Sequence, residues 1–97
     1  MRAYEYLLKY AQVWTTSDEE SDTCPSTVRQ LDLGNLLVED LHAIGVDNAR
    51  MDELGYVYAS IPATPGYEEK PALGFISHMD TAPDASGENV HPQLHPN

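Results

Sequence analysis

The stretch Pro71-Ala-Leu-Gly-Phe-Ile-Ser-His-Met-Asp-Thr-Ala-Pro-Asp84 combines a short apolar run with a histidine and an aspartate two residues apart. Residues 72–77 lack the alternation of a half-buried strand, so they predict a strand that is covered on both faces. Because residues i and i+2 of an extended chain share a face, His78 and Asp80 are expected to project together where the strand ends. Met79 is then expected to point back toward the core.

The pair of His78 and Asp80 has the chemistry of a metal site. Ligands of open α/β sheets bind at the carboxyl ends of the strands, where this pair is expected to lie. A carboxylate that holds a metal-binding imidazole in one orientation and one tautomer is the usual support of a zinc ligand. The spacing therefore indicates one zinc ligand, His78, with Asp80 as its support. Catalytic zinc sites use about three protein ligands for each ion, so this pattern is only part of a site.

The chain is short and strongly acidic. Its 97 residues predict one small domain, in which 16 Asp and Glu against 5 Lys and Arg give a net charge of −11. This charge disfavours nucleic acid or an anionic membrane surface as a partner and favours divalent metals or cationic groups. No apolar run approaches the roughly 18 residues that span a bilayer, and the single Cys24 cannot form an internal disulfide. Together these features predict a cytoplasmic protein.

Two amphipathic helices are expected in the N-terminal half. Residues 2–14 carry apolar and aromatic side chains at spacings of three and four, namely Tyr4, Leu7, Leu8, Ala11 and Trp14. A polar, acidic loop follows over residues 15–25. The second helix is predicted between a capping box, formed by Thr27 and Gln30, and a C-terminal glycine, Gly45.

The second helix is expected to bury a stripe that comprises Val28, Leu31, Leu37, Leu41 and Ile44. Gly34 lies inside this helix, where glycine costs about 1 kcal/mol relative to alanine. It indicates either close packing against a neighbouring element or a loss of stability that the fold tolerates. The sequence leaves both interpretations open.

A β-hairpin is predicted next, from the runs 50–54 and 56–61 on either side of Gly55. A loop over residues 62–71 leads from it to the strand 72–77. The fold class that results is α/β, with two N-terminal helices packed on a partial mixed sheet. This order of elements leaves a sheet edge and one face open, which complete domains usually cover, so it predicts an incomplete domain.

Other chemically active residues receive structural interpretations. His91 and His95 have a helical spacing, but each is followed by proline, which favours a loop. The acidic run 18–22 lacks the glycine and the distal glutamate of a calcium-binding loop and indicates a solvated turn. Cys24 has no identifiable base, so it is not a candidate nucleophile. The aromatic residues of the first helix are assigned to packing.

Five segments of the chain carry a family resemblance, and they are Ser17–Ser21, Pro25–Thr27, Leu36–Leu41, Tyr56–Tyr58 and above all Gly74–Asp84. Through them the chain resembles the M20 family of bacterial zinc metallopeptidases, and within that family the tripeptide aminopeptidases. The resemblance covers essentially all 97 residues. Its most specific part is the last segment, which contains His78 and Asp80.

The resemblance implies an activity and roles for the two residues. Members of the family use two zinc ions to release the N-terminal residue of short peptides, here tripeptides. By this resemblance His78 is the first zinc ligand, and Asp80 is the acidic residue that clamps the imidazole and counts as catalytic. The resemblance leaves the substrate-binding residues of this chain unknown.

The resemblance also implies what residues 1–97 lack. They correspond to the N-terminal part of the zinc-peptidase catalytic domain. The general base, the remaining ligands and the inserted lid domain through which members form homodimers lie further along the family's sequences. The separate chain is therefore expected to have no activity.

Two alternatives stay open. Another M20-type hydrolase, such as a dipeptidase or an aminoacylase-like enzyme, would share these segments, because residues further along decide the substrate. The other alternative is not an enzyme. An acidic remnant or binding module would use the open sheet edge to associate with a partner.

Overall fold

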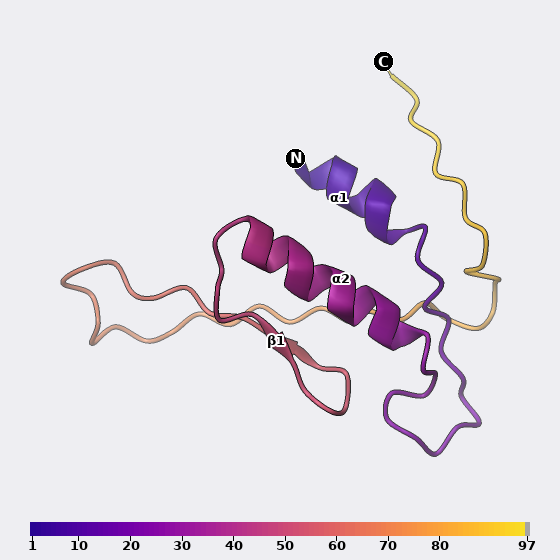
Figure 1. Ribbon diagram of the computed structural model, residues 1–97, viewed down its shortest axis with the longest axis horizontal. Coiled ribbons are helices and arrows are strands. Elements are labelled where there is room, and N and C mark those ends of the chain that lie inside the picture. The colour runs from indigo at the N-terminus through magenta and orange to yellow at the C-terminus, as the bar shows by residue number, and fades with distance from the viewer. Residues whose placement is uncertain (97) are drawn as a thin grey trace.

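The computed structural model describes residues 1–96 and contains two helices followed by a small sheet. The helices are α1 (Ala3–Tyr10) and α2 (Gln30–Ala43), and the strands are β1 (Arg50–Met51) and β2 (Val57–Tyr58). The hairpin of β1 and β2 packs on α2, and α1 lies on the other side of α2 (Figure 1). The predicted combination of helices and strands is confirmed, whereas the packing of both helices on one sheet is wrong.

Helix α1 is shorter than predicted and is joined to α2 by polar contacts. Nζ of Lys9 lies 2.6 and 2.8 Å from the two carboxylate oxygens of Asp40. The hydroxyl of Tyr10 donates a hydrogen bond of 2.9 Å to the same carboxylate. Tyr4 and Leu7 are exposed, so their assignment to a packed face is wrong. Few other elements are available to cover that face of so short a helix.

The N-terminus of α2 differs from the predicted capping box. Arg29 occupies the N-cap position and makes no side-chain cap hydrogen bond. The hydroxyl of Thr27 instead donates a bond of 2.9 Å to the carbonyl of Thr16, while Nε2 of Gln30 donates to the Thr27 hydroxyl at 3.0 Å. The capping-box prediction is therefore wrong, because the helix begins at Gln30 and the Thr27 hydroxyl accepts from the Gln30 side chain instead of from a backbone N–H.

The C-terminus of α2 follows the prediction. Gly45 has a φ of 94°, which L-residues with side chains rarely adopt. Its N–H donates to the carbonyl of His42 at 3.0 Å, and the N–H of Val46 donates to the carbonyl of Leu41 at 2.9 Å. These two bonds make a Schellman motif, which satisfies carbonyls that the end of a helix leaves free.

The buried part of α2 centres on Leu33 and Gly34. Val28 and Ile44 are exposed, so both ends of the predicted stripe are wrong. A Cβ atom added to Gly34 would collide with Sδ of Met51 on β1. The first interpretation of Gly34 is thus confirmed, because the absence of a side chain lets the hairpin approach α2 closely.

The predicted hairpin is confirmed, with shorter strands than expected. β1 and β2 are antiparallel, with Arg50 opposite Tyr58 and Met51 opposite Val57. Gly55, with a φ of 86°, lies in the connecting turn, where its N–H donates to the carbonyl of Asp52 at 3.1 Å. The sheet is thus purely antiparallel in the described part of the chain, and the prediction of a mixed sheet is wrong.

The predicted strand over residues 72–77 is also wrong. This segment is extended but unpaired, and the side chains of Leu73, Phe75 and Ile76 are almost fully exposed. A strand is stable only when a neighbouring backbone completes its hydrogen bonds. Within residues 1–96, no backbone–backbone hydrogen bond involves residues 71–80. The segment has the apolar composition of a buried strand, but no element within residues 1–96 covers it.

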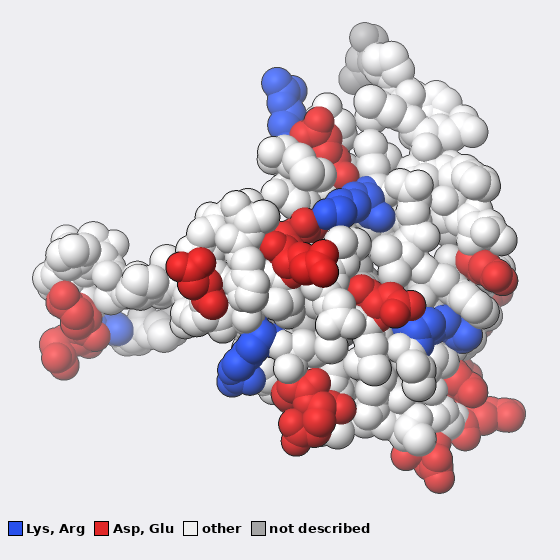
Figure 2. Space-filling model, viewed as in Figure 1, with Lys and Arg blue, Asp and Glu red and all other residues white. Residues whose placement is uncertain are grey.

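Acidic side chains outnumber basic ones on the face drawn in Figure 2 and are spread over most of it. Some opposite charges pair within the chain, as Lys9 and Asp40 do. Across residues 1–96, neither helix has the length and apolar character needed to cross a bilayer.

Candidate functional site

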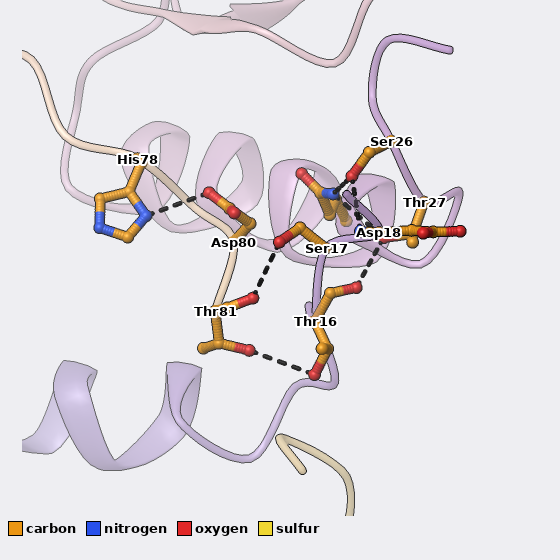
Figure 3. Close-up of polar contacts among 9 residues, drawn as sticks. Thr16, Ser17, Asp18, Ser26, Thr27, His78, Asp80 and Thr81 are labelled. Atoms are coloured by element: carbon orange, nitrogen blue, oxygen red, sulfur yellow. Dashed lines mark hydrogen bonds and ion pairs between the residues drawn. The ribbon is translucent and has the colours of Figure 1, made fainter. Parts of the chain in front are cut away.

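His78 and Asp80 form the hydrogen-bonded pair that their spacing predicts. Nδ1 of His78 lies 3.1 Å from Oδ1 of Asp80 (Figure 3). The side chain of His78 is 81% exposed and that of Asp80 is 35% exposed. Because an ionised carboxylate only accepts hydrogen bonds, Nδ1 is the donor, and Nε2 is the imidazole nitrogen that remains free to bind a metal.

The extended backbone positions the pair without a strand. His78 and Asp80 share a face because each is two residues from the other, and the half-buried Met79 lies between them. The juxtaposition thus follows from the local conformation, as predicted. The expected position at the end of a buried strand does not occur in residues 1–96.

The carboxyl group of Asp80 is held in its ionised form. Partial burial raises the pKa of this group, but the polar side chains of Ser17 and His78 beside the carboxylate outweigh that effect. The net pKa of Asp80 therefore lies below its ordinary value. An ionised carboxylate is the form that accepts a hydrogen bond from the imidazole N–H and keeps the imidazole in one tautomer.

Residues 15–17 form hydrogen bonds with Thr81, the residue that follows Asp80. The N–H of Ser17 donates to the carbonyl of Thr81 at 3.0 Å, and its hydroxyl donates to the same oxygen at 3.2 Å. The N–H of Thr81 donates in turn to the carbonyl of Thr15 at 3.3 Å. Sequence reasoning placed Ser17 in a solvated loop and did not assign it to the site; its position in a segment of the resemblance was the available signal.

A groove with a volume of about 730 Å³ lies beside the pair. Its walls include Leu37 and Leu41 of α2, Tyr56 of the hairpin turn region and the extended segment 75–80. Its lining is mostly apolar, with the His78 and Asp80 side chains among its polar members. Such a groove brings apolar surface next to the His78 imidazole.

The residues present fit one zinc-ligand position and do not complete a zinc site. His78 has the donor, a free Nε2, and Asp80 supplies the supporting carboxylate. Within residues 1–96, no three side chains of His, Cys, Asp or Glu come together as a metal-binding group. His91 and His95 lie in an irregular segment, as predicted. The remaining ligands of a zinc ion would have to come from outside these residues.

Comparison with known proteins identifies the class to which the chain is similar, the peptidases. No family model matches the sequence. The similar proteins are named peptidase T. The chain is 56% identical over 90 residues to peptidase T of Clostridium acetobutylicum, which is 93% of this chain and 22% of that protein. It is 49% identical over 90 residues to peptidase T of Bacillus subtilis, with the same two shares.

A third relative shows the same relation of lengths. Peptidase T of Clostridium perfringens strain 13 is 50% identical over 93 residues, which is 96% of this chain and 23% of that protein. The chain thus spans about a fifth of the length of the curated relatives that it matches. The resemblance to the peptidases is confirmed over nearly all of the chain.

Proposed function

We propose that this chain is the N-terminal part of the catalytic domain of a tripeptide aminopeptidase. The proposal rests on the sequence identity to peptidase T. About half of the aligned residues are identical, and the alignments cover 93% of this chain. The paired His78 and Asp80, which occupy the segment most specific to that resemblance, support it. The substrates would be short peptides with a free N-terminus.

We propose that zinc is the cofactor and that His78 is one of its ligands. Asp80 would hold the imidazole by Nδ1 and leave Nε2 available to the ion, and in this role it is proposed to count as catalytic. Zinc, when bound, would supply Lewis-acid chemistry to the substrate carbonyl and to a water molecule. The two zinc ions, the general base, the other ligands and the dimerisation domain of the complete enzyme would involve residues outside this chain.

The 97 residues alone are proposed to be inactive, because a single imidazole does not hold zinc as a catalytic site does. The experiment compares the purified 97-residue chain with the complete polypeptide from the same source. Both are assayed with a tripeptide, a dipeptide and an acylated amino acid in the presence of zinc or cobalt, with His78→Ala variants as controls. Tripeptide hydrolysis by the complete polypeptide alone, lost in His78→Ala, is the expected result.

The same assay contains the results that would contradict the proposal. Hydrolysis by the 97-residue chain that depends on His78 would show that the site is complete without further residues. A complete polypeptide that cleaves only the dipeptide or the acylated amino acid would indicate another hydrolase of this kind. No hydrolysis of any substrate would favour a non-catalytic module, for which the exposed apolar segment at Leu73, Phe75 and Ile76 would be the contact surface.

A further inference from the structure

The backbone that follows Asp80 is fixed to the beginning of the chain. Thr16 and Thr81 form an isolated parallel bridge, with 64 residues between them. The carbonyl of Thr81 accepts two hydrogen bonds from Ser17, one from the N–H at 3.0 Å and one from the hydroxyl at 3.2 Å. Residues 71–80 make no backbone–backbone bond within residues 1–96. Thr81 is therefore the point at which the extended segment is held to the rest of the fold.

Residues 15–17, to which Thr81 is hydrogen-bonded, are themselves fixed by burial and by further hydrogen bonds. Thr15 is 2% exposed and Thr16 is 8% exposed, in a chain with few buried residues. The carbonyl of Thr16 accepts bonds from the Thr27 hydroxyl at 2.9 Å and from Nε of Arg29 at 2.8 Å. Its hydroxyl pairs with that of Thr81 at 3.2 Å (Figure 3). A donor on this segment thus has a defined position, which a donor on a mobile loop would lack.

From these contacts we infer that Ser17 is a positioning residue for the pair of His78 and Asp80. Its amide and hydroxyl together fix the Thr81 carbonyl. The Thr81 N–H, which belongs to the peptide unit that follows Asp80, donates to the adjacent Thr15 carbonyl, so the backbone on the carboxyl side of Asp80 is restrained at both groups of Thr81. The Asp80 side chain then faces Nδ1 of His78, and Nε2 stays free. The inference that this arrangement assists metal binding rests on the proposed function. The inference that Ser17 positions the pair rests only on the hydrogen bonds described above.

The hydroxyl is the part of Ser17 that a substitution can remove without changing the backbone bond. With the N–H alone, the Thr81 carbonyl keeps one donor and gains rotational freedom. Two donors that converge on one oxygen restrict that rotation more than one donor does. The imidazole is exposed to water and the Asp80 carboxylate is partly so, and their contact therefore depends on such restraint.

The experiment reads the tautomer of His78 in the 97-residue chain by ¹⁵N NMR of the imidazole, at one fixed alkaline pH. The wild-type chain is expected to favour the Nδ1–H tautomer. In Ser17→Ala the ratio of Nδ1–H to Nε2–H is expected to fall by about two- to tenfold, the size of effect that one hydrogen bond has on an equilibrium. Ser17→Thr keeps the hydroxyl and is expected to restore the wild-type ratio.

The matched control is Ser21→Ala, in the same loop, because the Ser21 hydroxyl pairs with Thr23 and not with the site. An unchanged tautomer in Ser17→Ala, an equal change in Ser21→Ala or a wild-type chain without the Nδ1–H preference would overturn the inference. Failure of Ser17→Thr to restore the ratio would also overturn it. None of these readings requires zinc or turnover, so the inference and the proposed function fail separately.

Discussion

Nδ1 of His78 lies 3.1 Å from Oδ1 of Asp80, so the carboxylate engages one nitrogen of the imidazole and leaves the other free. A metal that binds Nε2 would meet an imidazole whose tautomer and direction are already set. Supporting carboxylates of this kind contribute to metal affinity although they do not touch the metal.

Replacement of this carboxylate tests its supporting role. We expect Asp80→Asn to weaken zinc binding by the complete polypeptide about 10- to 100-fold, because the amide does not stabilise the Nδ1–H imidazole as a carboxylate does. Titration with a zinc-buffering chelator measures the effect. Asp84→Asn, four residues further along on the exposed chain, is the control. Equal zinc affinity in Asp80→Asn and the wild type would contradict a supporting role.

The pair of Lys9 and Asp40 predicts how stability depends on acid. The pKa of Asp40 is lowered chiefly by the hydrogen bond from Lys9. Its contribution is present above the unfolded-state pKa of about 4 and is lost as the pH falls through the lower folded-state value. Asp40→Asn is expected to reduce the free energy of unfolding at neutral pH by about 1 kcal/mol, and by nothing measurable below pH ~2.

Urea unfolding at several pH values measures this difference. The control is Asp47→Asn, because Asp47 is an exposed residue in the connection between α2 and β1. A loss of stability in Asp40→Asn that stays constant down to the lowest pH would show that the effect comes from packing and not from the charge.

The contacts of Tyr10 lead us to expect that the free energy of unfolding falls at alkaline pH. Burial, together with the bond to Asp40, raises the pKa of its hydroxyl to about 12. An unfolded tyrosine ionises near pH 10, so the contribution of Tyr10 is present below about 10 and is lost as the pH rises toward 12. Tyr10→Phe is expected to flatten the fall in stability across this range. Absorbance titration of the phenols checks the pKa directly, and Tyr4→Phe, at an exposed position, is the control.

Gly34 predicts a packing conflict. Alanine in the middle of a helix usually adds about 1 kcal/mol of stability, but overpacking costs about 1–3 kcal/mol. Since the added Cβ would collide with Sδ of Met51, we expect Gly34→Ala to lower the free energy of unfolding by about 1 kcal/mol. In a Met51→Ala background the same change is expected to be stabilising. A stabilising effect in both backgrounds, measured by urea unfolding, would contradict the close approach.

Substitutions of Leu33 and Ile76 are expected to differ in their effect on the free energy of unfolding. Leu33 is 7% exposed, whereas Ile76 is 101% exposed. Leu33→Ala is expected to cost about 2–5 kcal/mol of unfolding free energy. Ile76→Ser is expected to change it by less than about 0.5 kcal/mol and to reduce self-association, measured by sedimentation. A large loss of stability in Ile76→Ser would show that residues 72–77 are buried in the folded chain.

Local sequence patterns predicted the parts of the structure that depend on neighbours in the chain. The spacing of His78 and Asp80 was sufficient to predict their contact, because the geometry of an extended chain places residues i and i+2 on one face. The end of α2 at Gly45 and the turn at Gly55 were predictable for a similar reason, since both positions require a positive φ.

The errors concern contacts between distant parts of the chain. The capping box at Thr27 failed because the helix begins only at Gln30, and the Thr27 hydroxyl bonds to the Thr16 carbonyl and to the Gln30 side chain. Nothing in the local pattern indicates the contact with Thr16. The strand 72–77 failed because its apolar composition records only a tendency to be buried, whereas burial itself needs a neighbouring element.

The sequence by itself determined the paired imidazole and carboxylate, the hairpin and the glycine-ended helix, because these follow from backbone geometry over a few residues. Only the tertiary structure decided that Ser17 holds the backbone after Asp80 and that α2 approaches β1 at Gly34. Such contacts depend on where separate segments meet in space, and the alternation of residues along one segment does not specify that meeting.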